Sequence, residues 1–283
     1  MTDKKQNFIV RTITGVLFVA ILVTCFFRAQ SMIMLFALIT GLTIWEFGRL
    51  VNEWDDIQIN RFISTVAGVY FFLAMAGYCT GMAASPTVFI PYLITIIYLI
   101  ISELFMKAPN PVNNWAYTML SQMYIALPLS TINLLAFQTG EEGQYNALLP
   151  LSIFIFLWVN DTGAYCVGSL IGKHKLFPRV SPGKTWEGSV GGGLLVLVAA
   201  AVIGWLTNGE TASLSIPVWM GLGLVVVVFG TLGDLVESMF KRTLGVKDSG
   251  NILPGHGGML DRFDSSLMAI PAAVVYLFTL SLF

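Results

Sequence analysis

The residues best equipped for chemistry are concentrated between positions 238 and 264, in a chain that otherwise avoids charge. This segment places four cations, three carboxylates and a histidine between two apolar stretches. Ionisable groups beside apolar sequence are costly to retain, so they are candidates for function. Cations mixed with carboxylates favour a polyanion bound together with a divalent metal. The candidate residues of the segment are Ser238, Lys241, Arg242, Lys247, Asp248, His256, Asp261, Arg262 and Asp264.

Carboxylates at the ends of apolar stretches are the candidate metal ligands. Asp234 follows an apolar run and, in a helix, would share a face with Glu237. Asp261 and Asp264 are spaced i, i+3 and would also share a helix face. Because carboxylate oxygens are hard ligands, we expect Asp234 and Asp261 to bind Mg2+, with Asp264 nearby and a second cation left open. A plain ion pair between Asp234 and Lys241 is the structural alternative.

His256 stands in a glycine- and proline-rich stretch, Pro254-Gly255-His256-Gly257-Gly258. Such flexible neighbours allow the backbone to approach a ligand closely, so we expect His256 to contact the ligand. The alternative is a histidine that is merely exposed in a loop. No cluster of cysteine and histidine accompanies it in the sequence, which argues against zinc.

A second polar segment lies upstream and contains Asp161, Ser181, Lys184 and Thr185. The run Gly183-Lys184-Thr185 suggests a P-loop, but that motif needs glycine at position 178, where this chain has proline. Backbone amides freed by glycine, the Lys184 ammonium and a hydroxyl from Ser181 or Thr185 can still bind a phosphate. Asp161 closes an apolar stretch and is a further candidate. The alternative is a solvated basic loop that only sets membrane topology.

The composition predicts an all-α polytopic membrane protein. The chain has 283 residues, of which 56% are hydrophobic and 11% charged, and its mean hydropathy is +0.77. Soluble domains carry about 25% charged residues. This chain therefore has too little polar surface for a water-soluble globule, and spanning helices bury its backbone polar groups best.

We expect about nine spans, because each needs about 20 apolar residues. They are Phe8–Phe27, Met32–Val51, Phe62–Met82, Val88–Met106, Trp115–Phe137, Ala147–Tyr165, Gly188–Leu206, Pro217–Val236 and Ser265–Phe283. Two regions follow: residues 1–140, with about five helices and no catalytic motif, and residues 141–283, a catalytic region with loops 161–187 and 237–264.

The lysines and arginines predict the orientation. With the N-terminus in the cytoplasm, the nine spans place all 15 basic residues except Arg28 on the cytoplasmic side, as the positive-inside rule requires. The C-terminus would then lie on the opposite side, and both polar loops would face the cytoplasm. In the first region, Glu46 and Glu103 lie near cytoplasmic span ends, where we expect them to be solvated at the interface.

The segment from Ser238 to Asp264 resembles the motif of the phosphatidate cytidylyltransferase family, the CDP-diacylglycerol synthases. Asp161-Thr162-Gly163-Ala164-Tyr165 and Ser181–Gly188 also resemble family elements. The residues that carry the match in the segment are Ser238, Phe240, Lys241, Arg242, Lys247, Asp248, Gly250, Leu253, Pro254, His256, Gly257, Gly258, Asp261, Arg262, Phe263 and Asp264.

The resemblance implies an enzyme that condenses CTP with phosphatidic acid to give CDP-diacylglycerol and pyrophosphate, with magnesium and as a homodimer. It implies a bacterial inner-membrane protein of phospholipid biosynthesis, whose partners are the two substrates and the lipid bilayer, and no nucleic acid. Asp234, Asp261, Asp264 and His256 would then be catalytic. The remaining candidates would bind substrate: Asp161, Ser181, Lys184, Thr185, Ser238, Lys241, Arg242, Lys247, Asp248 and Arg262.

Other functions stay open on the residues alone. A CTP-dependent lipid kinase would release CDP rather than pyrophosphate. A CDP-alcohol phosphatidyltransferase would need aspartates spaced i, i+4, whereas Asp261 and Asp264 are spaced i, i+3. An anion or organophosphate transporter would place its charges near the midplane, whereas these gather at span ends. A purely structural membrane subunit would leave the carboxylates at the span ends without a purpose.

Overall fold

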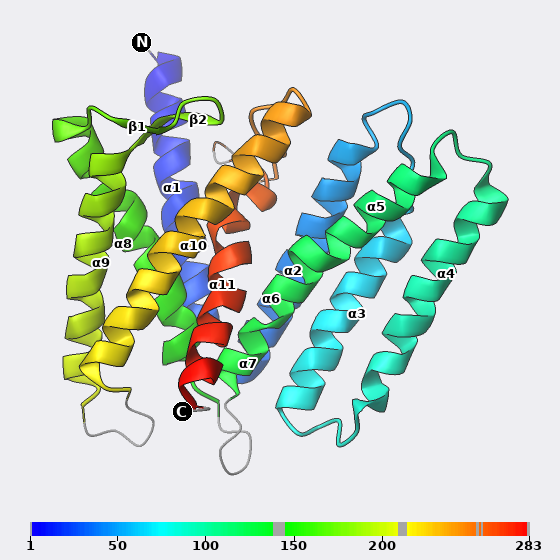
Figure 1. Cartoon of the computed structure of the whole chain (residues 1–283), viewed down its shortest axis with the longest axis horizontal. Helices are drawn as coiled ribbons and strands as arrows, with labels where there is room; N and C mark the ends of the chain where they lie inside the picture. Colours follow the sequence, from blue (N-terminus) through cyan, green and yellow to red (C-terminus); the bar gives the residue numbers. More distant parts are fainter. Residues whose placement is uncertain (1, 138–144, 209–213, 253–254, 256, 282–283) are drawn as a thin grey trace. The chain divides into compact units, whose positions relative to one another are not determined.

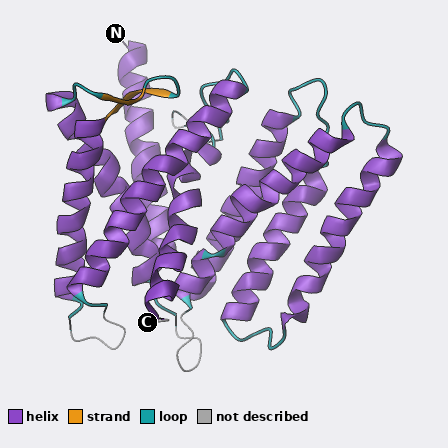
Figure 2. Cartoon of the chain, in the orientation of Figure 1, coloured by secondary structure: helices purple, strands orange, loops and turns teal. Residues whose placement is uncertain are grey.

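The computed structural model describes residues 2–137, 145–208, 214–252, 255 and 257–281. Within these ranges the chain is dominated by helices, with two short strands (Figure 2). It divides into two compact units. The first contains Met1–Leu148 and Leu244–Phe263, and the second contains Leu149–Thr243 and Asp264–Phe283.

The described part of the first unit consists mainly of helices. α2 and α3 pack along each other (Figure 1). α4 contacts α3 and α5, and α5 also contacts α2. The helices are α1 (Thr2–Cys25), α2 (Ala29–Val51), α3 (Arg61–Cys79), the 3-10 turn η1 (Pro86–Phe89), α4 (Ile90–Met106), α5 (Pro111–Ser121), the π turn η2 (Gln122–Ala126), α6 (Leu127–Ser130) and α7 (Ile132–Ala136). The polar segment Leu244–Phe263 also belongs to this unit.

The second unit combines long helices with a small hairpin. α9 and α10 make its most extensive helix contact. Its elements are α8 (Leu148–Ile171), β1 (Lys175–Phe177), β2 (Ser181–Thr185), α9 (Trp186–Leu206), α10 (Ile216–Thr243) and α11 (Leu260–Ser281). The strands pair antiparallel, with Lys175 opposite Thr185. The first residues of α11, up to Phe263, are assigned to the first unit.

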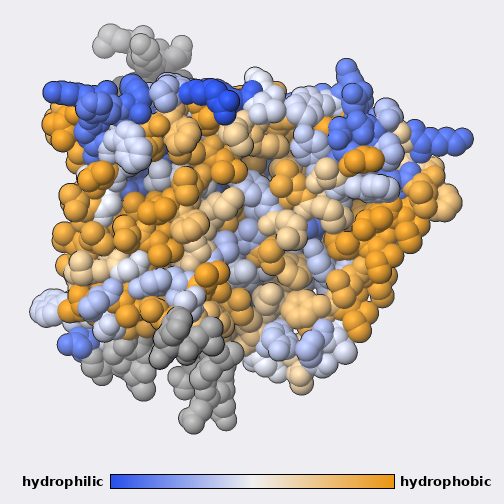
Figure 3. Space-filling model, in the orientation of Figure 1, coloured by the Kyte–Doolittle hydropathy of each residue, from blue (hydrophilic) through white to orange (hydrophobic). Residues whose placement is uncertain are grey.

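The expected all-α polytopic membrane fold is confirmed. Among the described residues, eight segments are long and apolar enough to cross a membrane: Ala29–Val51, Arg61–Cys79, Pro86–Met106, Pro111–Ala136, Leu148–Ile171, Trp186–Leu206, Ile216–Thr243 and Leu260–Leu280. The one remaining expected span, Phe8–Phe27, corresponds to α1, whose stretch Thr12–Cys25 is apolar but shorter. Hydrophobic side chains cover most of the helix surfaces visible in Figure 3, as contact with lipid requires.

Two helices run further than their apolar sequence suggests, so both polar loops are shorter than expected. α8 continues past Asp161 to Ile171, and α10 continues past Asp234 to Thr243. α8 packs closely on α9 both before and after Asp161. A Cβ placed on Gly192 would lie only 2.6 Å from the carbonyl oxygen of Asn160, and one placed on Gly188 would lie 2.7 Å from that of Ala164. Small residues such as glycine let membrane helices approach each other closely. This contact with α9 supports the helical conformation of α8 beyond Asp161.

This packing predicts that bulk at position 192 is harmful. We expect Gly192→Val to lower the free energy of unfolding by about 1–3 kcal/mol, because its side chain would overlap the α8 backbone. Gly183→Ala is the matched control, since a Cβ there would meet open space. Thermal unfolding of the purified protein in detergent measures both. An unchanged Tm for Gly192→Val would contradict the close contact of α8 and α9.

Candidate active site

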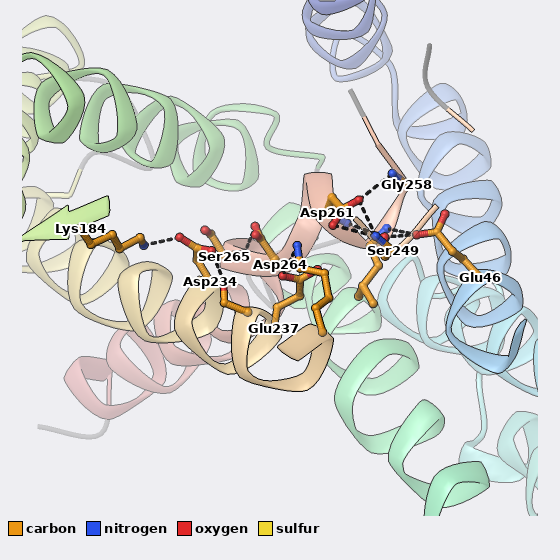
Figure 4. A network of polar contacts seen from close by, with 12 residues as sticks. Glu46, Lys184, Asp234, Glu237, Ser249, Gly258, Asp261, Asp264 and Ser265 are labelled. Atoms are coloured by element: carbon orange, nitrogen blue, oxygen red, sulfur yellow. Dashed lines mark hydrogen bonds and ion pairs between the residues drawn. The ribbon is translucent and has the colours of Figure 1, made fainter. Parts of the chain in front are cut away.

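Three carboxylates of the second unit converge. Asp234 and Glu237 project from one face of α10, and Asp264 projects from α11 (Figure 4). Each offers an oxygen, and these oxygens lie within 4.8 Å of one another. Two oxygens bound to one Mg2+ stand up to about 4.2 Å apart, so small side-chain rotations would let the three share an ion. The donor set, all hard oxygen, fits magnesium.

A glycine allows α10 and α11 to approach closely enough for this cluster. A Cβ on Gly233 would lie 2.8 Å from the carbonyl oxygen of Asp264 and 3.1 Å from that of Ser265. Any larger residue at position 233 would therefore push the α11 backbone away. Gly233, the residue before Asp234, thus allows the Asp264 backbone to lie against α10.

The β hairpin delivers Lys184 to the cluster. Lys184, near the end of β2, forms an ion pair with Asp234, and both side chains are about one quarter exposed, at 26% and 28%. The chain direction after Lys184 is fixed, because the Thr185 hydroxyl caps α9 by accepting the Gly188 N–H at 3.2 Å. Thr185 is itself buried, so the structure uses the hydroxyl expected to bind substrate as a helix cap.

A second lysine pairs with another carboxylate of the cluster. Lys241 Nζ is 2.7 Å from the Glu237 carboxylate, and the Glu237 side chain is fully buried. Asp234 itself pairs with Lys184 and accepts the Ser238 hydroxyl at 3.3 Å.

The carboxylates of the cluster are close enough to repel one another when they are ionised. Asp161 on α8 also lies within electrostatic range of Asp264. A divalent cation would offset this repulsion, so the cluster is suited to bind one.

Asp261 belongs to a different network, in the first unit. Its carboxylate accepts the backbone N–H groups of Ser249 at 2.9 Å and Gly258 at 2.7 Å (Figure 4). Gly257, in the left-handed region with φ 84°, turns the chain beside this carboxylate. Asp261 is thus held by backbone amides, and its role as a metal ligand stays a prediction.

The other candidates are distributed between the two units. Exposed on the surface are Arg242 in the second unit and Lys247, Asp248 and Arg262 in the first. Exposed cations are suited to bind a ligand that arrives from solution. Ser181 opens β2 in the second unit, partly buried. His256 lies outside the described residues, so its expected ligand contact stays a prediction.

Two acidic residues have roles that the sequence analysis did not assign. Glu237 completes the carboxylate cluster, and its i, i+3 spacing from Asp234 was the available signal.

The expectation that Glu46 is solvated at an interface is wrong: only 2% of it is exposed, and it accepts hydrogen bonds from the polar segment of the first unit. The signal for Glu46 was a carboxylate inside an apolar helix.

Fold and site together define a class: a polytopic membrane protein that presents a carboxylate cluster flanked by lysines. A family model described as "Cytidylyltransferase family" matches residues 9–280. The chain is 32% identical to the phosphatidate cytidylyltransferase of Staphylococcus aureus (strain COL) over 266 residues, 93% of this chain and 96% of that protein. It is 35% identical to that of Staphylococcus epidermidis (strain ATCC 35984) over 268 residues, with the same coverage.

The chain belongs to the cytidylyltransferase family. The resemblance seen in the motif from Ser238 to Asp264 is thereby confirmed, and it extends over nearly the whole chain rather than the second half alone.

The cluster predicts a magnesium site that can be measured without substrates. We expect Mg2+ to raise the Tm of the protein, because a ligand that binds only the folded state stabilises it. Asp264→Asn should weaken the apparent Mg2+ affinity by about tenfold or more, since it removes one hard oxygen anion. Asp56→Asn, which changes an exposed carboxylate, is the control. Equal Mg2+ responses from Asp264→Asn and the control would refute the site.

The ion pair of Lys184 with Asp234 predicts an effect of opposite sign. Without nucleotide, the Lys184 ammonium would compete with a metal for the same carboxylate. Lys184→Met should therefore tighten Mg2+ binding by about two- to fivefold, the size expected for a partly exposed ion pair. Lys173→Met removes an exposed lysine and should leave Mg2+ binding unchanged. Weaker Mg2+ binding in Lys184→Met would show that the two cations do not compete.

Proposed function

We propose that this chain is a phosphatidate cytidylyltransferase, which condenses CTP with phosphatidic acid to give CDP-diacylglycerol and pyrophosphate. The observation that carries the proposal is the match to relatives of that name, 32–35% identical over 93% of the chain. The lysine-flanked carboxylate cluster supports it, because both reactants are phosphates.

The chemistry is a displacement at phosphorus. An oxygen of the lipid phosphate attacks the α-phosphorus of CTP, the bond from that phosphorus to the oxygen bridging to the β-phosphate breaks, and pyrophosphate leaves with the electron pair. The lipid phosphate is already an anion, so no protein nucleophile is needed. The main obstacle is repulsion between two anions, and cationic side chains that hold both phosphates in line reduce it.

The cluster residues would take these roles. Asp234, Glu237 and Asp264 would hold Mg2+, whose charge offsets that of the phosphate oxygens. Lys184 would leave Asp234 for a CTP phosphate when the nucleotide arrives, and Lys241 would hold Glu237 in place.

The remaining candidates stay predictions within this mechanism. Asp261 and His256 are expected beside the reacting phosphates. The other candidates are expected to bind the substrates: Asp161, Ser181, Thr185, Ser238, Arg242, Lys247, Asp248 and Arg262. The homodimer implied by the family resemblance also stays a prediction.

We also propose that the reaction takes place at the cytoplasmic face of a bacterial plasma membrane. The support is the positive-inside arrangement, in which all 15 basic residues except Arg28 fall on one side of the predicted topology. The relatives are bacterial. CTP would reach the site from the cytoplasm, and phosphatidic acid would enter sideways from the inner leaflet.

The deciding experiment supplies the purified protein in nanodiscs containing phosphatidic acid with each nucleoside triphosphate in turn. We expect pyrophosphate release and lipid-linked CMP with CTP. Release of CDP together with a newly phosphorylated lipid would replace the proposal with a lipid kinase. Uptake of an organophosphate into sealed vesicles without chemical change would replace it with a transporter.

In the same assay, Asp234→Asn should lower kcat by about 100-fold or more, because it removes charge that acts on the reacting phosphates. Asp55→Asn, an exposed carboxylate of the first unit, should retain wild-type activity. Asp234→Asn with undiminished kcat at ordinary Mg2+ would remove Asp234 from the site.

A further inference from the structure

We infer that Glu46 is a positioning residue for Asp261 in the proposed reaction. Glu46 lies in α2, a helix without any motif residue, and only 2% of it is exposed. The inference rests on the proposed function for its catalytic consequence, but its structural part can be tested separately.

Glu46 caps the start of α11. Its carboxylate accepts the backbone N–H of Met259 at 2.8 Å and that of Leu260 at 3.2 Å. The first N–H groups of a helix have no partner inside the helix, and the helix dipole favours a negative charge beside them. A residue more than 200 positions away in the sequence therefore fixes where α11 begins.

Ser249 links Glu46 to Asp261. The Ser249 hydroxyl donates to the Glu46 carboxylate and accepts the backbone N–H of Asp261 at 3.3 Å, while the Ser249 N–H donates to the Asp261 carboxylate at 2.9 Å. Ser249 is fully buried. The orientation of Asp261 thus depends on Ser249, and the orientation of Ser249 depends on Glu46 (Figure 4).

α2 holds Ser249 through a second side chain. Arg49 lies one helical turn after Glu46 and donates from Nη2 to the Ser249 carbonyl oxygen at 3.0 Å. Residues at i and i+3 share one helix face. The last turns of α2 therefore contact Ser249 at both its hydroxyl and its backbone. A Glu46 carboxylate that served only to solubilise the protein would be exposed and would make no such contact.

The motif glycines fit this arrangement. A Cβ on Gly250 would lie 2.7 Å from a Glu46 carboxylate oxygen, and a Cβ on Gly258 would overlap the same carboxylate. Small residues at these positions thus leave the room that the Glu46 side chain occupies. The glycines at positions 250 and 258 are therefore the residues of the polar segment that accommodate Glu46.

The test combines hydrogen–deuterium exchange with kinetics on the full chain in nanodiscs. In Glu46→Gln, the side-chain NH2 faces backbone donors, so we expect the amides of residues 249 and 258–261 to exchange about tenfold faster. We expect kcat to fall about tenfold while the KM for CTP changes by less than threefold, because Asp261 is expected to act on the reacting phosphates. Glu53→Gln, an exposed carboxylate just after α2, should change neither.

Ser249→Ala is the second variant, in case Glu46→Gln does not fold. It should show the same pattern, and the double variant should be little worse than either single one, because the two side chains act through one chain of hydrogen bonds. Unchanged exchange in both single variants would overturn the inference. Faster exchange with wild-type kcat would overturn the positioning role and leave Glu46 purely structural.

A wild-type protein that forms no CDP-diacylglycerol would overturn the proposed function and, with it, the effect of Glu46 on the reaction. The exchange rates would still show whether Glu46 holds the segment, so the two failures are distinguishable.

Discussion

Carboxylates placed among apolar helices must be compensated, and this requirement governs the polar architecture of both units. An unpaired charge in such surroundings costs several kcal/mol or more, so each buried acid needs donors or cations within reach. Glu46 and Glu237 are almost completely buried, and both have such partners. The helix ends, the hairpin and the glycines of the polar segments are arranged around these few groups.

The two units compensate their acids with different chemistry. In the first unit, backbone N–H groups surround Glu46 and Asp261. Such donors are fixed by the fold, so they hold a side chain in one place. In the second unit, the ammonium groups of Lys184 and Lys241 pair with Asp234 and Glu237. Ammonium groups on flexible side chains can be displaced by a metal or can move to a phosphate. One network is therefore suited to positioning and the other to ligand exchange.

Features that depend on neighbours in the sequence were predictable from it. Eight of the expected spans correspond to helices that are long and apolar enough, because each span is a continuous stretch. Helical spacing placed Glu237 on the same face as Asp234, and the i, i+4 rule would have paired Lys241 with Glu237. The ends of α8 and α10 were missed, because hydropathy marks where lipid contact stops and not where the helix stops.

Contacts between distant segments could not be read from the sequence in the same way. Glu46 and Ser249 are separated by 203 positions, and no local pattern connects them. The motif nevertheless contained an indirect sign of the contact, because glycine at 250 and 258 leaves space for a side chain from elsewhere. Gly233 carries the same kind of information, since it leaves space for the Asp264 backbone on α11. At these three positions the glycine leaves room for another segment of the chain, and in two of them that segment brings the buried carboxylate of Glu46.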